Sequence, residues 1–134
     1  MRITNEADYA LRIVYSLLGG SQKSAKLIAE QTGVTLRFAL KILRKLAIAE
    51  IVGARQGASG GYYLKKKPEE ISIGLIIETI DGPFEVNNCL SEDFECSRMG
   101  KQVEACSFHC YFNELNTMIR NDMYRATLDR FMKT

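Results

Sequence analysis

Two helical stretches joined by a glycine-containing turn, with a glycine-rich hairpin directly behind them, constrain the fold of this chain most. The earlier helix is expected to begin near Ser24 and to stop at Gly33, and Thr35 is placed to cap the later one. Apolar residues in the later helix recur at intervals of three and four, and they are Leu36, Ala39, Leu40, Leu43 and Leu46. This spacing predicts one buried helix face, and the order of elements is that of a helix-turn-helix.

The stretch IVGARQGASGGYYLKKK follows this pair of helices. Residues 51–55 favour a strand, residues 57–61 a tight glycine-rich turn, and residues 62–64 a returning strand. A hairpin placed directly after a helix-turn-helix makes a winged helix. We therefore expect a mainly α fold with one small β-hairpin.

Further helices flank this motif. The first is expected over residues 5–18, with Asn5 as its N-cap. Another follows the hairpin, is capped by Ser72, and ends at Asp81-Gly82-Pro83, because glycine and proline end helices. From about residue 107 to residue 133, apolar side chains continue at helical spacing for longer than so small a domain needs. A long helix of this kind is suited to pack against its twin, so the pattern predicts a homodimer.

Positive charge is concentrated in the first half of the chain. Residues 1–67 contain 12 Lys and Arg against 4 Asp and Glu, whereas residues 68–134 contain 6 against 12. A basic half suggests contact with a polyanion, although the asymmetry also suits a self-complementary dimer. On the helix after Thr35, four cations share one stripe opposite the leucine face, and they are Arg37, Lys41, Arg44 and Lys45. Such a stripe suits the phosphate-lined major groove of double-stranded DNA, and an ordinary solvated face is the alternative.

The glycine-rich turn supports the same prediction. Its glycines allow the backbone to turn tightly and to approach another molecule closely, and Arg55 and Gln56 at its base can reach a phosphate or the minor groove. The turn lacks the glycine patterns of nucleotide-binding loops. The predicted DNA-contacting residues are Thr35, Arg37, Phe38, Lys41, Arg44, Lys45, Arg55, Gln56, Gly57, Ser59, Gly60, Gly61 and Tyr62. The expected domains are a winged helix-turn-helix DNA-binding domain over residues 1–83, and a cysteine-containing loop with a dimerisation helix over residues 84–134.

Residues 87–110 contain all four cysteines and the only histidine of the chain, and such clusters indicate disulfides or metal. The N-terminus resembles no signal peptide and no apolar run reaches the length of a membrane span, so we expect a cytoplasmic protein without a membrane partner. Cytoplasmic thiols stay reduced, which favours metal binding or redox chemistry over structural disulfides.

The cysteine spacing C-x6-C-x9-C-x3-C leaves several kinds of site open. An iron–sulfur cluster accepts loosely spaced cysteines, with histidine or a carboxylate at one position. A structural zinc site prefers two close pairs, and this chain has one. A thiol–disulfide switch is a further alternative. Cys106, His109 and Cys110 share one face at the start of the long helix, where the helix dipole stabilises thiolates. A single histidine without an orienting partner argues against a catalytic triad, so we do not expect an enzyme.

Four stretches together resemble the Rrf2 family of winged-helix transcriptional regulators, whose members include IscR, NsrR, RirA and CymR. They are ADYALR, TGVTLRFALKILRKL, GASGGYYL and PEEISIGLIIETIDG, the last with a cysteine soon after it, and the resemblance covers nearly the whole chain. It implies a homodimer that binds a partly palindromic operator as a repressor. It also implies a 2Fe–2S or 4Fe–4S cluster that gates operator binding and is held by Cys89, Cys96 and Cys106.

The resemblance leaves the fourth ligand of such a cluster open. IscR-like members place a histidine where this chain has His109, and NsrR-like members use an aspartate of the first helix, which matches Asp8 of the partner subunit. Cys110 is a third alternative. The chain also departs from the family pattern, because Cys96 and Cys106 are more widely spaced, Gln56 replaces an arginine, and Leu40 replaces an acidic residue. A CymR-like regulator of cysteine metabolism or thiol redox state without a cluster, or a regulator with structural zinc, therefore stays open.

Overall fold

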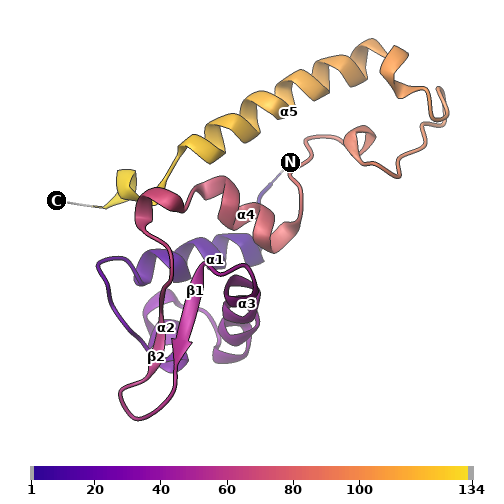
Figure 1. The fold of residues 1–134 in the computed structure, drawn as a ribbon. Coiled ribbons are helices and arrows are strands. Elements are labelled where there is room, and N and C mark those ends of the chain that lie inside the picture. Colours follow the sequence, from indigo (N-terminus) through magenta and orange to yellow (C-terminus); the bar gives the residue numbers. More distant parts are fainter. Residues whose placement is uncertain (1, 133–134) are drawn as a thin grey trace.

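A computed structural model describes residues 2–132 of the chain. The named elements are α1 (Asn5–Ser16), α2 (Ala25–Thr32), α3 (Leu36–Ile48), β1 (Val52–Arg55), β2 (Gly61–Leu64), α4 (Ile73–Asp81) and α5 (Ser107–Arg125), with short 3₁₀ turns between and after them. Helices α1 to α4 and the hairpin form one body, and α5 runs away from it as an arm that carries the cysteine loop at its far end (Figure 1). The mainly α fold with a winged helix and a long C-terminal helix is therefore confirmed. No helix within residues 2–132 combines the length and the apolar character that crossing a membrane requires.

Local sequence signals explain where the helices of the body begin. The hydroxyls of Ser24, Thr35 and Ser72 accept hydrogen bonds from backbone N–H groups one turn later, as predicted. The prediction for α1 is wrong by one residue, because Thr4 rather than Asn5 is the N-cap. The Thr4 hydroxyl accepts from the Ala7 N–H at 3.1 Å and donates to the Asp81 carboxylate at 2.6 Å.

The core of the body lies among α1, α3 and α4, whose contacting faces are apolar. On α3 the buried residues are Ala39, Ile42, Leu43 and Leu46. Leu36 and Leu40 were expected on this buried face, but they are 45% and 43% exposed. Ile42 fills the centre of the face, so these two leucines lie at its margins and remain on the surface beside the cationic stripe.

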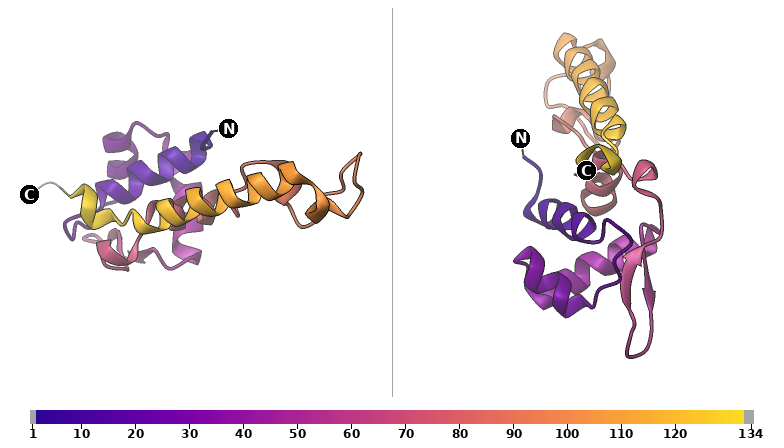
Figure 2. Two further views of the ribbon diagram at one scale, coloured as in Figure 1. Left: turned by 90° about the horizontal axis from the view of Figure 1, so that it is seen from above. Right: turned by 90° about the vertical axis from the view of Figure 1, so that its left-hand side faces the viewer.

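The hairpin is tied to the body by a third segment. Val52 pairs with Leu64 and Arg55 with Gly61, and residue Lys23 exchanges two backbone hydrogen bonds with Tyr62, at 3.0 and 2.7 Å. A Cβ atom at Gly61 would lie 2.6 Å from the Lys23 carbonyl oxygen, so only glycine permits this close approach. The wing therefore projects from a fixed base, as the right-hand view of Figure 2 shows.

Helix α5 ends at Arg125, which is earlier than predicted, and the last residue of the predicted helix lies outside the described residues. The cause is a return of the chain to the body. The Ile73 N–H donates to the Ala126 carbonyl at 2.9 Å, and the Leu128 N–H donates to the Ile71 carbonyl at 2.8 Å. Leu128 is only 3% exposed and joins the core. Burial of this leucine and pairing with residues 71–73 replace the final helical turns.

Candidate functional site

The outer face of α3 and the hairpin lie at the end of the body opposite α5 (Figures 1 and 2). The four predicted cations of α3 divide into two kinds. The Lys45 ammonium lies 2.8 Å from the Glu6 carboxylate and that of Lys41 lies 3.7 Å from it, so α1 partly neutralises both. Arg37 and Arg44 are exposed, and no ion pair to either is found within residues 2–132. These arginines are therefore the cations most available to a phosphate.

Other predicted residues of α3 support the helix. Thr35 caps it, and its hydroxyl accepts from the Phe38 N–H at 3.3 Å. The half-buried Phe38 ring packs edge-on against Tyr9, with ring centroids 5.6 Å apart, and the Lys41 ammonium lies 5.6 Å from the centre of the Phe38 ring. Phe38 thus sets the position of α3 on α1.

The wing is organised around Arg55. Its guanidinium lies 4.7 Å from the centre of the Tyr63 ring and donates to the Gln22 side chain at 3.3 Å, and Gln22 donates in turn to the Ser59 carbonyl. Gly60 is required in this turn, because a Cβ atom there would lie 2.2 Å from the Arg55 carbonyl. Gln22 was missed by the sequence reasoning, since it lies in the loop before α2 and belongs to no periodic pattern.

Three of the four cysteines and the histidine line one cavity of about 330 Å³ at the far end of α5. These residues are Cys89, Cys96, Cys106 and His109. All four cysteines of the chain are free thiols. Cys110 is not among the lining residues, and its thiol lies 3.5 Å from the Glu104 carbonyl, to which it donates. The structure thus places the four candidate ligands that the sequence ranked first around one cavity.

Short backbone turns place the three sulfurs. Cys89 lies in the 3₁₀ turn Asn88–Leu90, and Cys106 is the residue before α5. Cys96 and Gly100 exchange two backbone hydrogen bonds, at 2.9 and 2.7 Å, which closes a tight turn between them.

The electrostatic surroundings of these thiols differ. Backbone amides at the start of α5, foremost that of His109, lower the pKa of the Cys106 thiol, and the Arg98 guanidinium, which lies 3.1 Å from its sulfur, lowers it further. Burial and then the neighbouring Cys106 and Cys96 sulfurs raise the pKa of Cys89. Arg98 was another residue that the sequence reasoning missed, because nothing in the spacing links it to Cys106.

Two observations bear on what the cavity can hold. Within the described part of the chain, no three His, Cys, Asp or Glu side chains lie close enough together to bind a single metal ion. The Nδ1 atom of His109 is buried and has no hydrogen-bond partner within the same residues. An unpaired ring nitrogen in a cavity that three thiols also line is a donor set that an iron–sulfur cluster can accept.

The remaining candidate Asp8 lies on α1, in the body. Its carboxylate forms an ion pair of 2.9 Å with Arg12, one helical turn away. Within one subunit Asp8 and the cysteine cavity are therefore on separate parts of the molecule, and Asp8 could reach a cavity only across a dimer.

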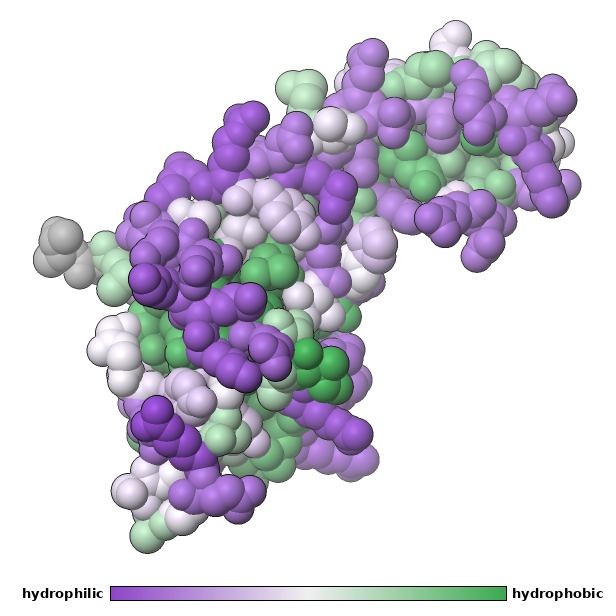
Figure 3. All heavy atoms as spheres, in the orientation of Figure 1, coloured by the Kyte–Doolittle hydropathy of each residue, from purple (hydrophilic) through white to green (hydrophobic). Residues whose placement is uncertain are grey.

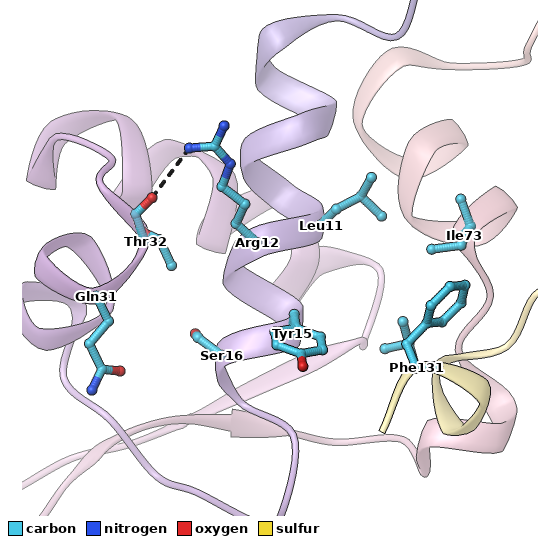
Figure 4. Close-up of a pocket in the computed structure, with 9 residues that line it drawn as sticks. Leu11, Arg12, Tyr15, Ser16, Gln31, Thr32, Ile73 and Phe131 are labelled. Carbon is cyan, nitrogen blue, oxygen red and sulfur yellow. Dashed lines mark hydrogen bonds between the residues drawn. The ribbon is translucent and has the colours of Figure 1, made fainter. Parts of the chain in front are cut away.

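An apolar groove of about 460 Å³ lies between α1, α2, α4 and the C-terminal turn. Figure 4 shows Leu11, Ile73 and Phe131 around it, with Arg12 donating to the Thr32 carbonyl at its other side. Its lining contains none of the predicted site residues. The groove is thus separate from both the outer face of α3 and the cysteine cavity.

A helix-turn-helix with exposed arginines on its second helix, followed by a wing, defines a winged-helix DNA-binding regulator. The family model Rrf2, described as iron-dependent transcriptional regulator, matches residues 3–134, so the chain belongs to the Rrf2 family. An rrf2-like regulator of Rhodobacter capsulatus is 35% identical over 95 residues, which are 66% of this chain and 63% of that protein. IscR of Pectobacterium atrosepticum is 25% identical over 98% of this chain and 79% of its own length.

Solved structures share the whole fold. CymR, the global cysteine regulator of B. subtilis, superposes with a TM-score of 0.73 at 22% identity, covering 99% of each chain. At this identity the likeness concerns the fold alone. The relatives are transcriptional regulators and not enzymes, which confirms the expectation that this chain is not an enzyme.

Proposed function

We propose that the protein is a homodimeric transcriptional repressor whose affinity for its operator is gated by an iron–sulfur cluster in the cysteine loop. The observation that carries this proposal is the shared cavity of Cys89, Cys96, Cys106 and His109. The IscR relative and the iron-dependent description of the family support it. Because the proposed partner is a DNA operator, the proposal also includes a cytoplasmic location.

In this proposal α3 enters the major groove and the wing contacts the adjacent backbone or minor groove. The contacts are those that the sequence predicts, and Arg37 and Arg44 contribute most because they are free of Glu6. A hydrogen bond to Gln22 and a cation–π contact with Tyr63 restrict the Arg55 side chain. Arg55 therefore loses little side-chain entropy when it binds a phosphate.

The proposed dimer forms along α5. Phe108, Tyr111 and Met118 are 71%, 58% and 69% exposed on this helix. A further hollow of about 500 Å³ lies among Leu115, Met118, Ile119, Met123 and their polar neighbours. Apolar side chains in this arrangement are suited to a second copy of the same helix. Figure 3 shows apolar, green side chains between purple ones over the arm.

The donor set supports the cluster among the alternatives for the cavity. Three thiols and the unpartnered His109 nitrogen would hold the cluster, which supplies a redox- and oxygen-sensitive group when bound. Structural zinc is less favoured, because structural zinc sites prefer two closely spaced ligand pairs and this loop has one. Asp8 of the partner subunit and Cys110 are weaker candidates for the fourth ligand, since Asp8 already pairs with Arg12 and Cys110 lies outside the cavity lining. A CymR-like regulator that uses its thiols without metal is the second candidate function, and the lowered pKa of Cys106 beside Arg98 favours it, because the thiolate is the reactive form.

Anaerobic reconstitution with iron and sulfide tests the proposal. Cys89→Ala, Cys96→Ala and Cys106→Ala should each abolish the visible absorbance of a cluster, whereas the control Cys110→Ala should retain it. His109→Ala should weaken or shift the absorbance. A wild type that takes up zinc but no iron and sulfide would overturn the cluster and favour structural zinc. Operator binding that changes with thiol oxidation in metal-free protein would favour the CymR-like function.

A further inference from the structure

We infer that Glu78 and Asn116 act as positioning residues that anchor the start of the cysteine loop and couple it to the DNA-binding body. The pair is called the loop anchor below. Its regulatory consequence rests on the proposed function, whereas its mechanical part stands on hydrogen bonds within this chain.

Glu78 on α4 joins three segments through one carboxylate. Its two oxygens accept from the Arg120 guanidinium at 2.8 and 2.6 Å, in a bidentate arrangement. The same carboxylate accepts from the Tyr124 hydroxyl on α5 and from the Phe84 backbone N–H at 2.6 Å. The Glu78 side chain is 11% exposed, and these donors, foremost Arg120, lower its pKa to about 2. Glu78 is therefore ionised throughout the physiological pH range and can accept hydrogen bonds from both α5 and the loop.

Asn116 on α5 fastens the next residues of the loop. Its carboxamide oxygen accepts from the Val86 N–H at 2.8 Å, and its NH2 group donates to the Phe84 carbonyl at 3.0 Å. Both contacts are needed at once, so the position requires a side chain with a donor and an acceptor side by side. Residues 84–86 thus have three of their backbone groups bound by two side chains.

The sequence makes such an anchor necessary at this point. Helix α4 ends at Gly82, whose φ of +82° lies in the left-handed region, and Pro83 cannot continue the helix. The residues that follow leave the body with unpaired backbone groups, which the anchor satisfies. Cys89 follows Val86 by three residues, and Cys106 directly precedes the helix that carries Asn116. The anchor therefore fixes both the segment that leads to Cys89 and the helix that follows Cys106 relative to α4.

Helix α4 connects the anchor to the DNA-binding body. Its residues Ile76, Ile77 and Ile80 are buried in the core that also supports α3. Besides the bonds to Glu78, further contacts hold α5 near its C-terminal end. A Cβ atom at Gly74 would lie 2.5 Å from the Tyr124 ring, and the Ile73 N–H donates to the Ala126 carbonyl. Loss of the Asn116 side chain should therefore free the loop while α5 remains docked, whereas loss of the Glu78 charge should also weaken the docking of α5.

Hydrogen exchange in the metal-free full-length protein tests the mechanical part. Asn116→Ala should speed amide exchange in residues 84–90 by at least about tenfold, because it removes two hydrogen bonds to this segment. Glu78→Gln should speed it by a smaller factor, because it weakens the one bond to the Phe84 N–H. Exchange in α1 and α3 should stay unchanged in Asn116→Ala. Asn113→Ala is the control, since this exposed asparagine lies one turn earlier on α5. Unchanged exchange in residues 84–90 of both variants would overturn the anchor.

Operator affinity of the same variants, with and without the reconstituted cluster, tests the coupling. Both variants should keep the visible absorbance of the cluster and the operator affinity of the metal-free protein. The ratio of operator affinity with the cluster to operator affinity without it should fall toward one. Variants that exchange faster yet keep the wild-type ratio would overturn the coupling. A wild type without cluster absorbance, or with a ratio of one, would instead reject the proposed function, and the exchange result would still decide whether the anchor exists.

Discussion

The winged-helix body and the α5 arm bury their apolar residues in different ways. The body, residues 2–82, supplies every buried apolar residue of the described chain except Leu128. Helix α5, all of which is described, has no buried residue although it carries Phe108, Tyr111 and Met118. A region that closes its own core is ordered by itself, whereas one that leaves its apolar side chains in water depends on what it contacts. The body thus closes its own core with one addition, Leu128 from the C-terminal turn, and the exposed apolar side chains of α5 support the proposed assembly along the arm.

The largest expected effect is a loss of unfolding free energy, which should be large for a buried leucine of α3 and small for an exposed one. Leu43→Ala should lower the free energy of unfolding by about 3 kcal/mol, because Leu43 is fully buried and truncation leaves a cavity. Leu40→Ala on the same helix should cost under about 1 kcal/mol, since Leu40 is 43% exposed. Urea denaturation followed by circular dichroism measures both. Equal losses would show that the α3 surface is not packed as described.

A substitution on the arm should act on assembly and leave the fold intact. Met118→Asp should weaken the dimer at least tenfold, about 1.4 kcal/mol, because a carboxylate would be buried in the proposed contact. Sedimentation across a concentration series measures this, and Met118→Leu should retain the dimer. A monomeric wild type at micromolar concentration would remove the proposed role of α5 and the contrast between the two regions.

The ion pair of Glu78 and Arg120, which links the body to α5, should lose its stabilising effect in acid. Because the pKa of Glu78 is lowered from 4.5 to about 2, its stabilising contribution is present above pH 4.5 and is lost as pH falls to 2. Arg120 is 43% exposed, so solvent screens the pair and we expect about 1–2 kcal/mol.

The stability difference between wild type and Glu78→Gln, measured by urea denaturation, should therefore be largest near neutral pH and shrink between pH 4.5 and 2. Glu69→Gln, at an exposed position of the body, is the control. A difference that grows in acid would contradict the assignment.

The smallest expected effect is a loss of operator affinity, which should differ between the cations of α3 that pair with Glu6 and those that do not. Arg44→Ala should weaken operator binding by about 1 kcal/mol and reduce the salt slope by about 1, as loss of a phosphate contact does. Lys45→Ala should cost less, because Lys45 already pairs with Glu6 at 2.8 Å. Fluorescence anisotropy at several salt concentrations separates the two variants. A larger loss for Lys45 would indicate that DNA displaces Glu6.

Much of the body follows from local sequence signals, because caps, glycine turns and helical periodicity act over a few residues. Ser24, Thr35 and Ser72 begin their helices as predicted. The same reasoning failed at Leu36 and Leu40, since periodicity locates a buried face but not its edges. The clustering of Cys89, Cys96 and Cys106 was visible in the sequence, whereas Arg98 beside Cys106 was not.

The sequence by itself determined the order of elements, the winged helix, the positive charge of the first half and the membership of the cysteine group. The tertiary structure decided which charges remain available and where the long helix ends. Glu6 neutralises Lys45, Glu78 binds Arg120, and Leu128 returns to the core. Each of these depends on residues far apart in the chain that meet only after folding. No pattern of a few neighbouring residues encodes such a contact, because its energy comes from the shared geometry of separate helices.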